Sequence, residues 1–332
     1  MALPDPAVVV DLIEAFRRSK TMFAAVSLGI FDRLASGPAE AHEIRGKGED
    51  PDTFERFLDA CVSLGLLQKQ GSAYANSPAA GAYLCRESPQ TLTGYVRYSN
   101  EVLWRMWANL EDAVREGSHR WKQTFDLDGP LFSSYYSTEE RKREFLLGMH
   151  GFGTMSSPGV VAAFDLSRFR RLVDLGGATG HLPMAARARY PQLRVAVFDL
   201  APVIEIARGF THGTDVELIA GDFFTDPLPD ADLYALGRIL HDWNEEKIRR
   251  LLDKIYAALP AGGGLLIAEK LLNDDLCGPV STTMQSLNML VGTEGRERSF
   301  RQYADLLQDA GFAETEGKVT GLPLDAVLAL KK

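Results

Sequence analysis

A glycine-rich turn in the middle of the chain has the composition of a site for a nucleotide-type cofactor. The stretch from Leu172 to Gly180 reads LVDLGGATG, an apolar run that reaches an acid and is followed by glycines. Glycine permits positive φ angles and lets a ligand approach the backbone without a Cβ in the way. Ala178 interrupts the G-x-G-x-x-G spacing of dinucleotide-binding folds. The turn therefore favours adenosylmethionine over NAD, although strand-to-helix turns that bind nothing also use glycine.

Two acids lie at the carboxyl ends of the next two predicted strands. Asp199 lies 23 residues after Gly176, where a carboxylate could accept both ribose hydroxyls of an adenosyl group. After the following strand, Asp222 could hydrogen-bond an adenine amino group while Phe223 packs on the ring. Each acid by itself could equally be a ligand-free strand end or turn. Together with the glycine turn they lie at the carboxyl ends of three successive strands, where open α/β sheets bind ligands.

A histidine at the same predicted edge could act as a general base. His241 follows the fourth strand in the sequence RILHDW. A lone histidine is most often structural, but the pKa of imidazole suits proton abstraction near neutrality. Glu269, which ends the fifth strand, and Glu297 could orient the ring and stabilise its cation. We therefore predict that His241 is a general base, and no cluster of histidines and cysteines with ligand spacing suggests a metal.

A doubly wound α/β sheet would position all these residues. Strand candidates alternate with helices from residue 170 onward, at 171–175, 194–199, 216–220, 232–236 and 264–269. Alternation of this kind predicts a parallel sheet. Two last strands, at 314–319 and 326–330, are joined by a loop too short for a crossover, so they should be antiparallel. We expect an α/β fold with a mostly parallel, seven-stranded sheet in residues 166–332.

Helices dominate the chain before the sheet. In residues 1–95, apolar residues at helical spacing and a hairpin near 66–76 indicate a winged-helix module. Its candidate recognition helix carries Asp52, Glu55, Arg56 and Asp59, and a DNA-reading helix should be basic. A dimerisation unit is therefore favoured over DNA binding. Residues 96–165 form a second helical segment whose aromatic side chains could line a substrate pocket.

Composition narrows the class of protein. The 332 residues are too many for one ordinary domain, and a net charge of −9 disfavours nucleic-acid binding through phosphate attraction. The three cysteines are widely spaced, which suits a reducing compartment rather than a disulfide framework. No basic leader or long apolar run indicates secretion or membrane insertion. We expect a cytoplasmic protein.

Longer motifs resemble one family along nearly the whole chain. The matching segments are SLGIFDRL, CVSLGLL, LVDLGGATG, VFDLAPVI, GDFF, GRILHDW, GGGLLIAEKLL and MQSLNMLVGTEGRERS. They resemble the plant-type small-molecule O-methyltransferases, and especially the hydroxyindole (acetylserotonin) branch. The resemblance implies a class I methyltransferase fold, adenosylmethionine as cofactor with adenosylhomocysteine as product, no metal, a small aromatic hydroxyl substrate, and a homodimer formed through the N-terminal module.

The same resemblance implies roles for individual residues. It places the catalytic base on His241 and the two flanking acids on Glu269 and Glu297. Asn288 is similar to an asparagine that contacts substrate. The residues implied to bind the cofactor are Gly176, Gly177, Asp199, Gly221, Asp222, Phe223, Arg238 and Tyr136.

Three positions depart from the family pattern. Ala178 replaces a common third glycine, and Ala201 is inserted between Leu200 and Pro202. Gly153 stands where the hydroxyindole branch has a tryptophan near the cofactor, which weakens the case for acetylserotonin itself as substrate. Three rival hypotheses remain: a catalytically silent dimeric scaffold, a winged-helix regulator and an NAD-dependent enzyme.

Overall fold

The chain folds into two compact units. The computed structural model describes residues 3–127 and 139–332. The first unit comprises residues 1–104 and the second residues 105–332. The boundary expected after residue 95 falls inside helix α6 (Thr93–Tyr98), and the one expected after residue 165 does not separate units. The first unit extends further because Trp104 packs edge-on against Phe23, with ring centroids 6.1 Å apart.

The N-terminal unit is helical with a small antiparallel sheet. The predicted hairpin forms strands β2 (Leu67–Gln70) and β3 (Ala73–Asn76), and β1 (Ala39–Glu40) adds a third strand in the order β1-β3-β2. The helices are α1 (Ala7–Ser27), α2 (Ile30–Arg33), α3 (Ala41–Ile44), α4 (Pro51–Ser63), α5 (Pro78–Tyr83), α6 and the π-helical turn η1 (Ser99–Leu103). Asp59 of α4 accepts hydrogen bonds from Lys69 and Tyr74. One acidic residue of the helix therefore joins it to the small sheet of the same unit.

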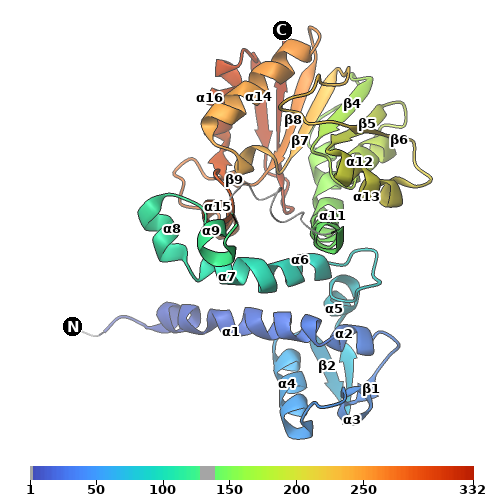
Figure 1. Ribbon diagram of the computed structural model, residues 1–332, viewed down its shortest axis with the longest axis vertical. Helices are drawn as coiled ribbons and strands as arrows, with labels where there is room; N and C mark the ends of the chain where they lie inside the picture. Colours follow the sequence, from blue (N-terminus) through green and yellow to red (C-terminus); the bar gives the residue numbers. More distant parts are fainter. Residues whose placement is uncertain (1–2, 128–138) are drawn as a thin grey trace. The chain divides into compact units, whose positions relative to one another are not determined.

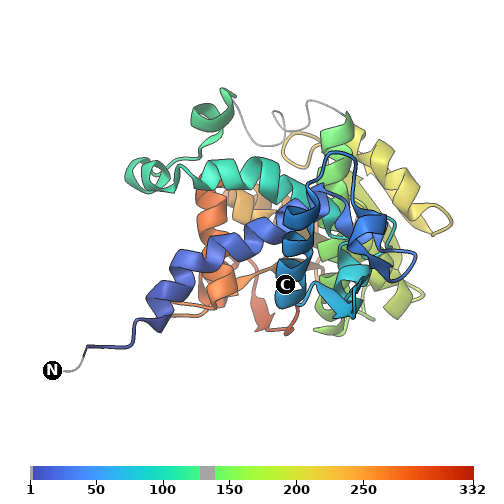
Figure 2. The same ribbon diagram turned by 90° about the horizontal axis from the view of Figure 1, so that it is seen from below.

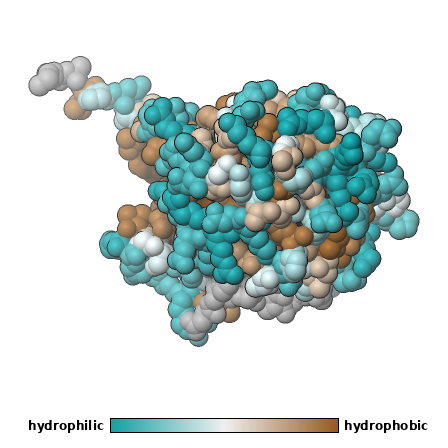
Figure 3. Space-filling view, turned by 90° about the horizontal axis from the view of Figure 1, so that it is seen from above, coloured by the Kyte–Doolittle hydropathy of each residue, from teal (hydrophilic) through white to brown (hydrophobic). Residues whose placement is uncertain are grey.

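The first half of α1 carries apolar side chains that the described residues of its own unit leave exposed. Figures 1 and 2 show this half of the helix projecting beyond α4. Val8, Leu12 and Phe16 are 72%, 71% and 54% exposed. Apolar side chains are visible on the projecting segment in Figure 3. The helical face predicted from spacing therefore exists, but within the unit it faces solvent.

The C-terminal unit is built on a seven-stranded sheet. Its order is β11-β12-β8-β7-β4-β5-β6; β12 runs antiparallel to both of its neighbours, β11 and β8, and the other pairs are parallel. The strands are β4 (Arg171–Leu175), β5 (Arg194–Asp199), β6 (Val216–Ala220), β7 (Leu233–Gly237), β8 (Gly264–Glu269), β11 (Glu314–Lys318) and β12 (Asp325–Leu330). A separate parallel pair joins β9 (Leu271–Leu272) to β10 (Arg298–Ser299). The predicted sheet is confirmed.

Helices cover both faces of the large sheet (Figure 1). Apolar residues of α14 (Glu245–Ala258) and α16 (Phe300–Asp309) form one core with the strands, and those of α11 (Glu139–Ala162) and α12 (His181–Arg189) form the other. The remaining helices are α7 (Trp104–Trp107), α8 (Leu110–Glu116), α9 (Trp121–Phe125), α13 (Ala201–Thr211) and α15 (Val280–Gly292). Because helices cover both faces, a ligand can reach the strands at their carboxyl ends, where the candidate functional groups lie.

Two further expectations concern the surroundings of the protein. Among the described residues, none of the helices combines the length and the apolar character that a membrane span requires. All three cysteines are free thiols, with Cys61 and Cys85 buried and Cys277 exposed.

Candidate active site

The glycine turn after β4 has a backbone that side chains would obstruct. Gly176 and Gly180 have φ angles of 73° and 81°. A Cβ on Gly176 would lie 2.5 Å from Ile239 Cδ1, and one on Gly177 would lie 2.8 Å from Asp174 Oδ2. Ala178 also has a positive φ of 47°, a conformation that usually favours glycine. The turn is therefore a cradle that depends on small residues.

Two carboxyl groups lie under this turn. Asp199 accepts hydrogen bonds from the backbone N–H groups of Ala178 (2.9 Å) and Leu200 (2.7 Å). Asp174 is buried, and within the described chain its Oδ1 has no hydrogen-bond partner. Burial raises the pKa of Asp174 to about 8, with a further contribution from Asp199, and burial raises the pKa of Asp199 to about 6. The orphaned oxygen fits a site for a cationic or hydrogen-bond-donating ligand group.

The GDFF segment lies against the turn. The ring of Phe223 would come within 3.4 Å of a Cβ on Gly176, so the two predicted cofactor positions adjoin. Gly221 leaves room for Phe198, whose Cε2 would be 2.3 Å from an added Cβ. Asp222 Oδ1 accepts the backbone N–H of Phe224 at 2.8 Å, which closes the local turn.

Arg238 leaves β7 in a strained conformation. Its φ is 57°, and its guanidinium lies 5.2 Å from the centre of the Phe152 ring. Its buried Nε has no hydrogen-bond partner among the residues described. A non-glycine residue in this region is uncommon and is often found at functional sites. This geometry is compatible with the cofactor contact that the resemblance implies.

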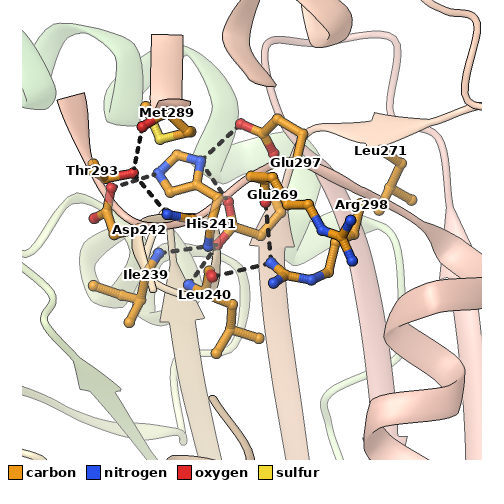
Figure 4. Close-up of polar contacts among 12 residues, drawn as sticks. Ile239, Leu240, His241, Asp242, Glu269, Leu271, Met289, Thr293, Glu297 and Arg298 are labelled. Carbon is orange, nitrogen blue, oxygen red and sulfur yellow. Dashed lines mark hydrogen bonds and ion pairs between the residues drawn. The ribbon is translucent and has the colours of Figure 1, made fainter. Parts of the chain in front are cut away.

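His241 is held by two buried glutamates (Figure 4). It belongs to a short 3₁₀ turn, η2 (Leu240–Asp242), directly after β7. Its Nδ1 lies 2.8 Å from Glu297 Oε1 and 3.3 Å from Glu269 Oε2. Because a carboxylate only accepts, Nδ1 carries a proton and donates it to Glu297. The Nε2 atom is therefore the nitrogen that can receive a proton from a substrate.

The two glutamates have different functions in the structure. Oε1 of Glu269 accepts the backbone N–H groups of Ile239 and Leu240, both at 2.9 Å, and that of His241 at 3.4 Å. Glu269 therefore fixes the backbone turn that carries the histidine, while Glu297 fixes the imidazole ring. The sequence predicted that both glutamates would orient the imidazole ring and stabilise its cation, and it did not distinguish between them.

Burial and charge have opposing effects at this cluster. Burial by itself would lower the pKa of His241, but Glu269, Glu297 and Asp242 together raise it to about 10. Burial raises the pKa of Glu269 to about 7, against the effect of the neighbouring imidazolium. The ligand atoms of His241, Glu269 and Glu297 lie within 4.8 Å of one another, a grouping that could also hold a metal ion. The imidazolium already supplies the positive charge that the carboxylates require.

Several site residues were missed by reasoning from the sequence. Asp174 precedes the glycines in the motif, so its position was a usable signal. Asp242 directly follows the histidine, and its Oδ1 lies 3.7 Å from Nε2 of His241. Gly295 gave no signal, because its contact is distant in sequence: a Cβ there would lie 2.1 Å from the backbone oxygen of His241.

Two predicted residues come from helical parts of the chain. Asn288 of α15 accepts a hydrogen bond at its Oδ1 from the Trp107 indole N–H, at 2.9 Å. Because an indole can only donate, this bond fixes the orientation of the amide. Tyr136 lies outside the described residues.

Known proteins resemble the chain along its whole length. Residues 107–313 match the O-methyltransferase domain family, and residues 10–86 match the O-methyltransferase dimerisation domain. Acetylserotonin O-methyltransferase of Bos taurus is 40% identical over 332 residues, which cover 97% of this chain and 96% of that protein. A probable bifunctional dTTP/UTP pyrophosphatase/methyltransferase protein of Homo sapiens is 38% identical over 99% of this chain, which spans only 54% of that protein.

A solved structure resembles the fold closely. The crystal structure of human N-acetylserotonin methyltransferase in complex with SAM matches with a TM-score of 0.93 and 38% identity, covering 100% of this chain and 99% of that one. The predictions of family, fold and enzyme class are confirmed. The chain belongs to the O-methyltransferase family of class I methyltransferases and carries that family's dimerisation domain at its N-terminal end.

Proposed function

We propose that this protein transfers a methyl group from adenosylmethionine to a hydroxyl group of a small aromatic molecule, with His241 as the general base. The observation that carries the proposal is the buried His241–Glu297 pair, with Nδ1 and Oε1 at 2.8 Å. It lies at the end of β7, which pairs with β4, the strand that leads into the glycine turn. The base and the cofactor cradle thus share one edge of the sheet.

Residues around the glycine turn are suited to hold adenosylmethionine. Gly176 and Gly177 let the backbone of the turn pass close to Ile239 and Asp174, and the orphaned Oδ1 of Asp174 could accept the ligand's ammonium group. Asp199 retains acceptor capacity for ribose hydroxyls beyond its two backbone bonds. We assign Gly221, Asp222, Phe223 and Arg238 to the same ligand because the first three follow β6 and the last follows β7 at this edge.

The chain's own contribution to the chemistry is proton removal and positioning. When bound, adenosylmethionine supplies an electrophilic methyl group on a cationic sulfur. His241 Nε2 takes the proton of the acceptor hydroxyl, and Glu297 stabilises the resulting imidazolium through Nδ1. An oxygen anion and a sulfonium cation lose their charges as they react, so a site that excludes water and aligns the reactants should provide most of the acceleration.

Asn288 is proposed to contact the acceptor. The Trp107 indole occupies its amide oxygen, so the amide nitrogen remains available to donate. A donor at this place would select an aromatic hydroxyl compound that also carries a hydrogen-bond acceptor. The aromatic substrate class itself rests on the family resemblance.

The protein is proposed to work as a homodimer in a reducing compartment such as the cytoplasm. The dimerisation domain match covers residues 10–86, which include most of α1 with the exposed Leu12 and Phe16. A second copy would remove that apolar face from water. The three free cysteines suit a reducing environment. Light scattering should give the molar mass of a dimer for the unchanged protein. For Phe16→Asp it should give a lower mass, because a larger fraction is monomeric.

Calorimetry followed by a methyl-transfer screen tests the proposed function. We expect adenosylmethionine to bind, and labelled methyl to reach one or more compounds among hydroxyindoles, flavonoids, phenolic acids and quinols. Absence of binding would contradict the proposal. Binding without transfer to any of these four classes would favour the silent scaffold instead.

A further inference from the structure

One face of α11 lies against the residues that end the glycine turn. His150, Gly153 and Ser157 are spaced at i, i+3 and i+7, which places them on the same side of the helix. His150 Nδ1 lies 2.8 Å from Thr179 Oγ1, inside the turn. Ser157 Oγ lies 2.9 Å from Nδ1 of His181, the first residue of α12 after the turn. The helix therefore bonds to the turn's last part at two points.

Between these two bonds the helix backbone and an imidazole ring are in direct contact. A Cβ on Gly153 would lie 2.2–2.4 Å from three ring atoms of His181. Only glycine at position 153 leaves this space for the ring. The missing side chain of α11 and the ring of His181 are therefore complementary in shape.

Both imidazoles are neutral near pH 7, so the two bonds do not depend on a charge. Burial lowers the pKa of His181 to about 3, with smaller contributions from His150 and Arg238. Burial also lowers the pKa of His150. The ring of His150 packs in addition against Phe210 of α13, with centroids 4.6 Å apart. Neither contact therefore requires a protonated imidazole.

We propose that His150, Gly153, Ser157 and His181 are positioning residues that clamp the glycine turn in the conformation that binds adenosylmethionine. The inference rests on the proposed function, because the turn is the proposed cofactor cradle. Gly176, Ala178 and Gly180 all have positive φ angles. Glycine has many accessible backbone conformations, so holding this turn in one of them costs conformational entropy. A turn that is ordered before binding loses less conformational entropy when the ligand arrives. The clamp therefore acts on cofactor affinity and not on the proton-transfer step.

Two substitutions at one position separate the hydrogen bond from general packing. In His150→Asn the amide can place a polar atom where Nδ1 was, whereas in His150→Gln the polar atoms extend to the place of Nε2. We expect His150→Gln to weaken the binding of adenosylhomocysteine about 3- to 10-fold, the size of one lost hydrogen bond. His150→Asn should stay within about twofold of the unchanged protein. Ser157→Ala should match His150→Gln, all measured by calorimetry.

A double substitution tests the contact between Gly153 and the ring. Gly153→Ala should weaken adenosylhomocysteine binding, because its methyl group collides with His181. Adding His181→Ala removes the collision, so the double variant should bind more tightly than Gly153→Ala alone. If the free-energy losses of adenosylhomocysteine binding in Gly153→Ala and His181→Ala simply add in the double variant, the proposed fit between Gly153 and the ring is wrong.

The unfolding midpoint of the ligand-free variants shows which idea fails. If the substitutions lower the midpoint but leave affinity unchanged, the contacts are structural only and the clamp is wrong. Equal losses of affinity in His150→Asn and His150→Gln would also overturn it. If the unchanged protein does not bind adenosylhomocysteine at all, the proposed function fails before the clamp is reached.

Discussion

Two pairs of buried carboxyl groups lie at the carboxyl edge of the same sheet, and they differ in how their charge is balanced. Asp174 and Asp199 lie beneath the glycine turn, where the described residues supply Asp199 with backbone N–H groups and leave Asp174 Oδ1 unpartnered. Glu269 and Glu297 surround His241, whose ring lies 3.3 Å and 2.8 Å from them. The second pair contains its own cation and the first does not.

Under the proposed function, this difference separates ligand binding from proton transfer. A buried acid without a partner is costly, and it either keeps its proton or gains a cationic ligand. A buried acid beside an imidazole raises the basicity of the ring instead. The first pair is therefore suited to binding a cation, and the second to making a strong base.

The largest effect should come from removing the base. His241→Ala should lower kcat roughly 10²–10⁴-fold, because general base catalysis is lost, while adenosylmethionine still binds at the other pair. Steady-state kinetics and calorimetry measure the two quantities. His212→Ala, at an exposed histidine, is the matched control. Unchanged turnover in His241→Ala would remove the proposed role.

The next effect concerns the pair that lacks a cation. Asp174→Asn should weaken adenosylmethionine binding about 10- to 100-fold, since a hydrogen bond to a charged group is lost. Turnover at saturating adenosylmethionine should change much less. The control is Asp215→Asn, an exposed acid paired with Arg187. If kcat falls and affinity does not, the division between the two pairs is wrong.

The pH profile reports on the pair that contains the imidazole. His241 must be neutral to accept a proton, and its pKa of about 10 means that the neutral fraction grows as pH rises toward that value. We expect kcat/KM to increase with pH above neutrality. Glu297→Gln should lower the pKa of His241, so the rising limb should move down by about one pH unit or more. Glu294→Gln, at an exposed acid bonded to Lys247, should leave the profile unchanged.

The smallest effect is on the stability of the ligand-free protein. The folded-state pKa of Asp174 is about 8, above its ordinary value of 3.8, so the folded state holds its proton more tightly than the unfolded state. That contribution to stability is fully present below about pH 4 and is lost as pH rises through about 8. Asp174→Asn should therefore raise the unfolding midpoint at pH 8 by a few degrees, with little gain at pH 4. A loss of stability at pH 8 would contradict the raised pKa.

Periodicity and motif spacing predicted most of the second unit. Four of the first five strand candidates have the observed bounds, because buried parallel strands are short apolar runs between turns. Ser299 and Gln302 form a capping box at the start of α16, a pattern that four residues of sequence suffice to encode. The extent of the first unit depends on contacts such as that of Trp104 with Phe23, which join residues far apart in sequence.

The sequence alone determined which chemical groups stand at the ends of consecutive strands, because parallel strands deliver their carboxyl ends to one edge. It also determined the family, through motifs spread over the whole chain. Tertiary structure decided what each acid does. Glu269 holds a backbone turn, Glu297 holds a ring, and Oδ1 of Asp174 has no hydrogen-bond partner in the part of the chain that the structure describes, since burial and contact depend on segments distant in sequence. The same reason hid Gly295, whose missing side chain makes room for the backbone of His241, and it hid the contact of Gly153 with His181.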